Sequence, residues 1–320
     1  MTEARTMLSL AIEYLAERRR LGFDLTIPGG QIVAFARFVD ATGHTGTLTA
    51  GVVLDWVQGK ATRATPLTWA HRLRILRPFA KYLTRLDPAT EFPMAPIFGP
   101  EYPRLSPHIY SDAEIGELLA AARRLPPEGT LRPITYETIF GLIAASGLRI
   151  SEALNLRCGD VDAVRELLTV RQTKFRKSRH VPLHATAVAA LERYMGMRAR
   201  HGATSADAPL FLSSSGGPLP KRTVHGVFQK IRTQQGWINR GAHAEIRIHD
   251  LRHAFICRRV QLWHDGGADI DNAMAALSTY VGHVKISDTY WYLTGVPDLM
   301  AIAGKRFEDF AANGGQDHHD

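Results

Sequence analysis

A histidine and an arginine stand three residues apart in the segment His249-Asp-Leu-Arg252. On a helix this spacing places both side chains on one face. The planar guanidinium of arginine keeps its charge and donates two parallel hydrogen bonds, so such a face suits a site that holds anionic oxygens. His253 follows His249 at a four-residue spacing that can also bind zinc. No third ligand is apparent, however, and Arg252 would place a positive charge beside the metal.

A second arginine, Arg149, lies upstream in the segment Ser146-Gly-Leu-Arg149. Its side chain has the same capacity to bind anionic oxygens. Glu152 follows one helical turn later, so an ordinary ion pair between Arg149 and Glu152 is the alternative interpretation.

Three tyrosines near the end of the chain compete for the role of a nucleophile: Tyr280, Tyr290 and Tyr292. The last two are separated by two residues, which is about 200° of rotation on a helix. They therefore point to opposite faces, and only one of them can address a bound phosphate.

Two short β-like runs, Leu167–Val170 and Arg179–Leu183, flank the basic segment Thr173–Ser178. This pattern predicts a β-hairpin with lysines at its tip. A lysine on such a turn can reach a leaving oxygen and protonate it as a general acid. Lys174 has the position for this role, and Lys177 is its equally basic rival.

The elements that must position these groups are mostly helical. In the first hundred residues, apolar side chains recur at helical spacing in four runs, and Pro78 inside the fourth is expected to kink or divide that helix. The fourth run also carries a basic face, formed by Arg72, Arg74, Arg77, Lys81 and Arg85. This face could grip phosphates or be an ordinary solvated surface, and the sequence leaves both interpretations open.

A dense run of prolines separates this part of the chain from the rest: Pro88, Pro93, Pro96, Pro100, Pro103 and Pro107. Such a run disfavours regular structure and predicts an extended linker. We expect a helical domain at residues 1–87, a linker at 88–108, a larger second domain at 109–311 and a disordered tail at 312–320. Ser111-Asp-Ala-Glu114 predicts a capping box at the first helix of the second domain.

The composition indicates a basic chain of ordinary hydrophobic content. It has 320 residues, a formal charge of +8 and a pI of about 9.6. Nucleic acid is the commonest partner of so basic a chain, and an ordinary basic surface is the alternative. Cys158 and Cys257 show neither a metal-ligand spacing nor a disulfide pattern, which fits a reducing cytoplasm. Neither a secretory signal nor a membrane-spanning run is expected.

Taken in order, six positions resemble the motifs of the tyrosine recombinase, or phage integrase, family: Arg149, Lys174, His249, Arg252, His283 and Tyr292. The segment Ser146–Leu154 is similar to the family's first arginine motif, and Tyr292 follows His283 at the nine-residue spacing of the family's nucleophile. The resemblance covers about residues 105 to 310. The first hundred residues resemble the family's core-binding domain only in size and helicity.

The resemblance implies a mainly helical fold with a small β-hairpin or sheet, in which two domains close around duplex DNA as a C-shaped clamp. It also implies that the catalytic domain is the second one, at residues 109–311. Arg149 and Arg252 would clamp the non-bridging oxygens of the scissile phosphate, where negative charge builds up. His283 would hydrogen-bond the same phosphate, and His249 would add a donor or act as the base near the tyrosine.

The same resemblance implies a DNA strand transferase. Tyr292 would attack phosphorus and form a 3′-phosphotyrosine, and Lys174 would protonate the leaving 5′-oxygen. The covalent link conserves the phosphodiester energy, so we expect no ATP, metal or other cofactor. The expected partner is double-stranded DNA with inverted half-sites, bound by a dimer on each site and a tetramer in the synapse. The expected location is the bacterial cytoplasm, at the nucleoid.

The stretch between Arg252 and His283 is longer than in chromosome-resolving recombinases, and the segment Tyr290–Thr294 looks more like that of transposon recombinases. This favours integration, excision or transposition of a mobile element, with other recombinases of that element as further partners. A type IB topoisomerase or telomere resolvase and a DNA-binding accessory protein without catalysis remain alternatives. The run Leu299–Phe310 is expected to form a small helix that docks on its own domain or on a neighbouring protomer.

Overall fold

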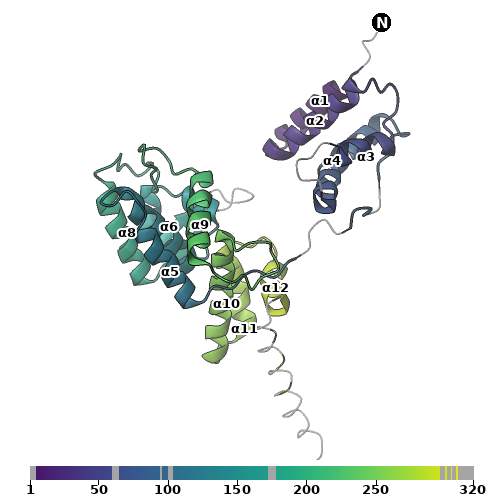
Figure 1. Cartoon of the computed structure of the whole chain (residues 1–320). Helices are drawn as coiled ribbons and strands as arrows, with labels where there is room; N and C mark the ends of the chain where they lie inside the picture. Colours follow the sequence, from purple (N-terminus) through teal and green to yellow (C-terminus); the bar gives the residue numbers. More distant parts are fainter. Residues whose placement is uncertain are drawn as a thin grey trace, which may run out of the picture. The chain divides into compact units, whose positions relative to one another are not determined.

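A computed structural model describes residues 5–59, 65–93, 96–99, 104–171 and 178–295, together with the single positions 300, 304 and 308. The chain divides into two compact units, Met1–Arg104 and Leu105–Asp320. Helices dominate both units and one small sheet lies in the second, so the predicted fold class is confirmed (Figure 1). Within the described ranges, no helix is both long enough and apolar enough to cross a membrane.

The first unit is built from the four predicted helical runs: α1 Met7–Arg20, α2 Thr26–Ala41, α3 Ala50–Gln58 and α4 Pro66–Leu86. Threonines cap three of these helices by accepting a hydrogen bond from a backbone N–H of the first turn. Of the two expected effects of Pro78, a kink or a division, division does not occur, because α4 continues through this proline. Buried Leu76 and Phe79 pack into the core on either side of Pro78, which offsets the lost backbone hydrogen bond.

The predicted basic face of α4 divides into two kinds of residue. The Arg72 guanidinium donates to the carbonyls of Trp56, Val57 and Gly59 at 2.9–3.2 Å and so closes the end of α3. Arg72 therefore supports the fold. The exposed members of the face follow one another at four-residue spacing: Arg77, Lys81 and Arg85.

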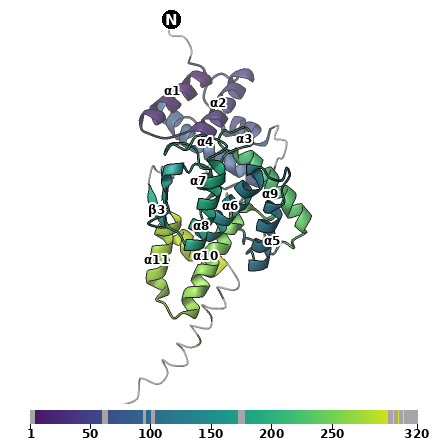
Figure 2. The same ribbon diagram turned by 90° about the vertical axis from the view of Figure 1, so that its left-hand side faces the viewer.

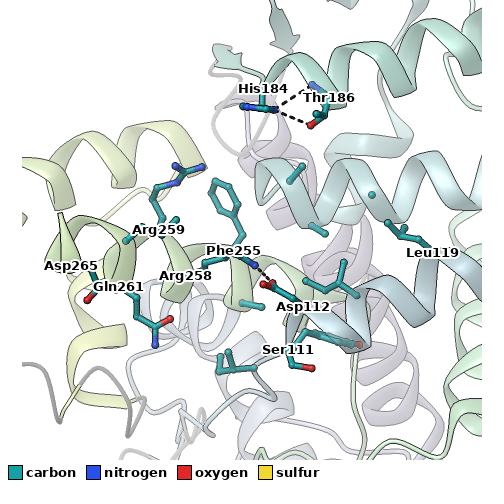
Figure 3. Close-up of a pocket in the computed structure, with 18 residues that line it drawn as sticks. Ser111, Asp112, Leu119, His184, Thr186, Phe255, Arg258, Arg259, Gln261 and Asp265 are labelled. Carbon is teal, nitrogen blue, oxygen red and sulfur yellow. Dashed lines mark hydrogen bonds and ion pairs between the residues drawn. The ribbon is translucent and has the colours of Figure 1, made fainter.

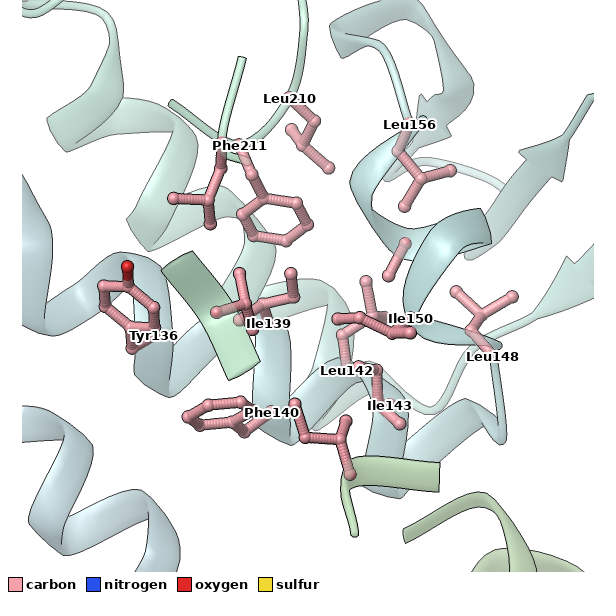
Figure 4. Packing of buried hydrophobic residues seen from close by; sticks show 14 of the residues in the cluster. Tyr136, Ile139, Phe140, Leu142, Ile143, Leu148, Ile150, Leu156, Leu210 and Phe211 are labelled. Carbon is pink, nitrogen blue, oxygen red and sulfur yellow. The ribbon is translucent and has the colours of Figure 1, made fainter. Parts of the chain in front are cut away.

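The second unit packs around α6, which is buried on nearly all sides. Its helices before the site are α5 Asp112–Arg123, α6 Leu131–Ser146, α7 Ile150–Leu154, α8 Ala185–Arg198 and α9 Lys221–Gln235. Figure 4 shows Ile139, Phe140 and Ile143 of α6 meeting Leu148 and Phe211 from later loops. The predicted capping box at the start of α5 is confirmed, with both of its hydrogen bonds formed.

The sheet has three antiparallel strands in the order β1-β2-β3: β1 Val161–Asp162, β2 Leu167–Val170 and β3 Arg179–Pro182. The two predicted strands are confirmed to within one residue. The sequence did not indicate β1, because two residues are too few to show a period. The tip of the hairpin, with Lys174 and Lys177, lies outside the described residues.

Three helices complete the second unit: α10 Ile248–Asp265, α11 Ile270–Val281 and α12 Ser287–Gly295. Helices α10 and α11 lie side by side, and α11 also contacts β3 (Figure 2). Together with α12 they bury a separate apolar cluster that includes Tyr292. The expected terminal helix at 299–310 and the tail at 312–320 lie outside the described residues, apart from positions 300, 304 and 308.

Gly147 ends α6 with a positive φ of 64°, and a Cβ there would lie 2.5 Å from the Phe255 ring. Gly236 ends α9 with a φ of 65° but has open space around it. Gly236→Ala is expected to lower the free energy of unfolding by about 1–2 kcal/mol through backbone strain alone. Gly147→Ala should cost a further 1–3 kcal/mol or so from overpacking. Urea unfolding of both variants checks this, and equal losses would contradict the close approach.

Candidate active site

Arg252 is the most deeply buried of the predicted site residues, with 1% of its surface exposed. Its two terminal nitrogens donate to the carbonyl of Gly147 at 2.6 Å and to that of Val281 at 2.8 Å. These bonds tie α10 to the ends of α6 and α11. Burial, followed by the charge of Arg149, lowers the pKa of Arg252 to about 9, so it stays protonated at neutral pH. The two bonds use two of its five N–H donors, which leaves donors for an anion.

Arg149 reaches the same turn from the start of α7. It donates to the Gly282 carbonyl at 3.1 Å and to a carboxylate oxygen of Glu152 at 2.9 Å, with about a third of its side chain exposed. The ion pair considered as an alternative is thus present, but it does not occupy the whole guanidinium. Adjacent carbonyls, those of Val281 and Gly282, therefore bring the two arginines together.

Glu152 is the anion that holds this cluster of charges. It accepts two hydrogen bonds from Arg179 at 2.9 and 3.1 Å and also one from the backbone N–H of Arg149. Burial by itself would raise the pKa of Glu152, but the bonds and charges of Arg179 and Arg149 outweigh it and lower the pKa to about 2. Arg179 also donates to the Tyr280 carbonyl at 2.8 Å, which anchors β3 to α11.

The two predicted site histidines, His249 and His283, stand near the arginines and are neutral. His249 is exposed at its surface, and the loss of hydrating water within the site, with the charges of Arg252, Arg247 and Arg149, lowers its pKa to about 4. His283 is half-buried and hydrogen-bonded through Nδ1 to the Thr289 hydroxyl at 2.7 Å. Burial and then Arg252 lower the pKa of His283 to about 3.

Tyr292 enters the site from α12, with 2% of its surface exposed. Its hydroxyl lies 2.6 Å from Nδ1 of His253, and its ring is parallel to that of His283 at 6.4 Å. Burial raises the pKa of Tyr292 above its ordinary value, which keeps the phenol protonated. Tyr280 instead donates its hydroxyl hydrogen to the Pro182 carbonyl at 2.9 Å and so is committed to β3. Tyr292 therefore contacts His253 through its hydroxyl and lies beside the predicted His283.

Five of the six predicted site residues thus gather where α10, α11 and α12 meet the end of α6, and Lys174 falls outside the described residues. Two contributors were not singled out from the sequence. Apart from a zinc spacing with His249, the sequence indicates for His253 only a histidine that supports the site or belongs to the core, and for Arg179 only the start of a strand. Both make their contacts across more than 25 residues of sequence, which no local spacing reveals.

A metal centre finds no support in the described part of the chain. No group of three histidine, cysteine or acidic side chains there could hold an ion. The rings of His249 and His253 stand perpendicular at 4.7 Å, and Nδ1 of His253 is already bonded to Tyr292.

A hollow of about 780 Å³ lies elsewhere on α10 and is lined by none of the predicted site residues. Figure 3 shows Phe255, Arg258 and Arg259 of α10 at this hollow, with Asp112 of α5 paired to Arg258. The predicted site residues therefore lie outside this hollow, where α10, α11 and α12 meet.

Glu152→Gln is expected to lower the free energy of unfolding by roughly 3 kcal/mol at neutral pH, because two arginines lose their buried counter-charge. The folded-state pKa of Glu152, about 2, is below its ordinary value of 4.5. The stabilisation is therefore present above pH 4.5 and is lost as the pH falls towards 2. Unfolding curves of wild type and variant across this range measure the difference, which should shrink with falling pH.

Glu137→Gln is the matched control, since Glu137 pairs with the well-exposed Arg123. It should change the free energy of unfolding by less than about 1 kcal/mol. A Glu152→Gln effect as small as this, or one independent of pH, would contradict the role given to Glu152.

Comparison with known proteins shows which family this sequence belongs to. The model of the phage integrase family matches residues 110–295. A protein of Sinorhizobium fredii named as an integrase/recombinase, y4rB, is 40% identical over 300 residues, covering 92% of this chain and 95% of that one. The tyrosine recombinase XerC of Bacillus licheniformis is 26% identical over 309 residues, covering 94% and 95%.

Among solved structures, the integrase of transposon Tn1549 in complex with a circular intermediate DNA superposes with a TM-score of 0.64 at 17% identity. The match covers 95% of this chain and all of that one, so the folds agree over both units. The family model spans more than half of the sequence, and the relatives align over nearly the full length. The chain belongs to the phage integrase family, the family of the tyrosine recombinases, and is a DNA strand-transfer enzyme.

Proposed function

We propose that this enzyme is a site-specific recombinase that cuts and rejoins duplex DNA through a 3′-phosphotyrosine on Tyr292. One observation carries the proposal: Arg149 and Arg252 converge on the adjacent carbonyls of Val281 and Gly282, and the Tyr292 hydroxyl of the same chain is buried beside them. The two guanidinium groups could bind the anionic oxygens of a phosphodiester, and the neighbouring hydroxyl could attack its phosphorus.

The step follows from the charges at the site. As the Tyr292 oxygen bonds to phosphorus and the bond to the 5′-oxygen breaks, negative charge builds on the non-bridging oxygens, where two guanidinium groups stabilise it. His283 is neutral and can donate one hydrogen bond to the phosphate. We assign the phenolic proton that Tyr292 loses as it attacks to His249, which is neutral and can accept it as the base. We assign the proton of the leaving 5′-oxygen to Lys174. Attack by another 5′-hydroxyl reverses the step, so no energy source is needed.

The mode of DNA binding is part of the proposal. The exposed, regularly spaced cations of α4 would contact phosphates, and the first unit would close with the second around the duplex as a clamp. Phosphate contacts of this kind dominate affinity and weaken with salt. Two protomers would occupy inverted half-sites and four would form the synapse. The enzyme would act in the cytoplasm, at the bacterial nucleoid.

A mobile-element role is favoured over chromosome resolution. The relative y4rB bears an integrase/recombinase name, and a transposon integrase shares the fold. We propose integration, excision or transposition, with further recombinases of the same element as partners. A topoisomerase with the same residues would relax supercoiled DNA that lacks a specific site, whereas this enzyme should be nearly inert on it.

Tyr292→Phe should abolish covalent trapping on a nicked suicide substrate, a loss of at least about a thousandfold, because the nucleophilic oxygen is gone. Denaturing gel electrophoresis of the protein–DNA adduct measures this. Tyr290→Phe is the matched control, two residues away on α12, and should trap within about threefold of wild type. Trapping by the Tyr292→Phe variant would move the nucleophile elsewhere, and a wild type that never traps would favour a DNA-binding accessory protein.

Lys174→Ala should slow cleavage of ordinary DNA by about a hundredfold or more, because the leaving oxygen lacks its acid. A substrate with a bridging 5′-sulfur has a leaving group that needs no proton and should restore much of the rate. Lys177→Ala, in the same turn, should change neither reaction. Lys174 would not be the general acid if the sulfur substrate failed to rescue Lys174→Ala. The same would follow if Lys177→Ala were defective and the sulfur substrate rescued it.

A further inference from the structure

His253 makes a contact that the scheme above does not use. Its Nδ1 lies 2.6 Å from the Tyr292 hydroxyl oxygen, and the two rings are 5.4 Å apart. The bond joins α10 to α12 across 39 positions of sequence. The nucleophilic atom of the proposed reaction is thus hydrogen-bonded to a side chain outside the predicted catalytic set.

The imidazole of His253 is held on two further sides. The His249 ring packs edge-on against it at 4.7 Å and 87°, and the Trp291 ring lies 6.4 Å away. His253 also directly follows Arg252 in α10. The acceptor of the tyrosine bond is therefore fixed to the same rigid helix as the buried arginine.

Both partners of this bond are neutral. Burial first, then electrostatic interaction with His249, Arg247, Arg252 and His243, lowers the pKa of His253 to about 2. Burial raises the pKa of Tyr292 above its ordinary value, even though Arg252 opposes this. The proton thus stays on the phenol, and neutral Nδ1 can act as the acceptor.

We propose that His253 is the positioning residue of the nucleophile: its Nδ1 accepts the Tyr292 hydroxyl hydrogen and so turns the oxygen's free lone pair towards a phosphate held by Arg149 and Arg252. The hydrogen of a phenol lies near the ring plane, so an acceptor that fixes the hydrogen also fixes the lone pairs. Without this acceptor the hydroxyl rotates and fewer molecules hold an attacking geometry. The inference rests on the proposed function of Tyr292.

The test compares two replacements of His253. His253→Leu removes the acceptor and should slow single-turnover adduct formation on the suicide substrate by about 10- to 100-fold. Its affinity for the same DNA should stay within about twofold of wild type, since the residue acts on orientation and not on binding. His253→Asn places an amide oxygen near the position of Nδ1 and should recover most of the rate. His264→Leu is the matched control on the same helix: the His264 ring contacts the neighbouring Asp265, so this variant should react like wild type.

A bridging 5′-sulfur substrate separates this role from action on the leaving group. His253 acts on the attacking oxygen, so the ratio of wild-type to His253→Leu rates should be the same for sulfur and oxygen substrates. Three results would each overturn the proposal. The sulfur substrate could rescue His253→Leu, His253→Leu could react as fast as wild type, or His253→Asn could be as slow as His253→Leu.

Two controls separate a folding defect from a loss of function, and failure of the positioning role from failure of the proposed function. If thermal unfolding shows that His253→Leu does not fold, His253→Phe, which keeps a ring and lacks the acceptor, takes its place with the same expectations. If wild type itself forms no adduct, the proposed function fails and the positioning role fails with it. An active wild type with an unaffected His253 variant overturns the positioning role alone.

Discussion

The structure of the site depends on holding two guanidinium groups, those of Arg149 and Arg252, close together. Like charges repel, and burial makes the repulsion more costly. The turn after α11 solves this, because the carbonyls of Val281 and Gly282 accept from Arg252 and Arg149 in turn. Glu152 supplies a full negative charge to Arg149 and also binds Arg179. The arginines are thus positioned by protein dipoles, and their remaining donors stay available.

The surrounding fold serves this turn. Gly147, in the left-handed conformation that ends α6, offers its carbonyl to Arg252. Arg179, at the start of β3, fixes the end of α11 through the Tyr280 carbonyl and explains why a small sheet is attached to a helical unit. Gly282 has a positive φ of 71°, which other residues rarely adopt, and a Cβ there would also crowd the Arg179 guanidinium, so the turn favours a glycine. Helix, strand and turn therefore meet at one set of polar contacts.

Much of this arrangement could be predicted from the sequence, and the features that could not be predicted share a physical cause. Helical periodicity, the Ser111–Glu114 capping box and the hairpin strands were predicted because each depends on neighbours within a few residues. The continuity of α4 through Pro78 was not predicted, because it depends on tertiary packing. The contact of His253 with Tyr292 was invisible for the same reason. The spacing of His253 from His249 pointed to a helix face, but only the docking of α12 on α10 shows what that face meets.

The charge balance of the site indicates which kind of ligand suits it. Three arginines, Arg149, Arg179 and Arg252, lie around the carboxylate of Glu152, so these four side chains together carry a surplus of positive charge. This surplus helps to keep His249, His253 and His283 neutral, because each would add a further cation. A phosphodiester brings the missing negative charge, and its arrival weakens the same repulsion. Binding of DNA would therefore relieve a strain built into the resting site, and the neutral histidines and phenol let it do so without first releasing a proton.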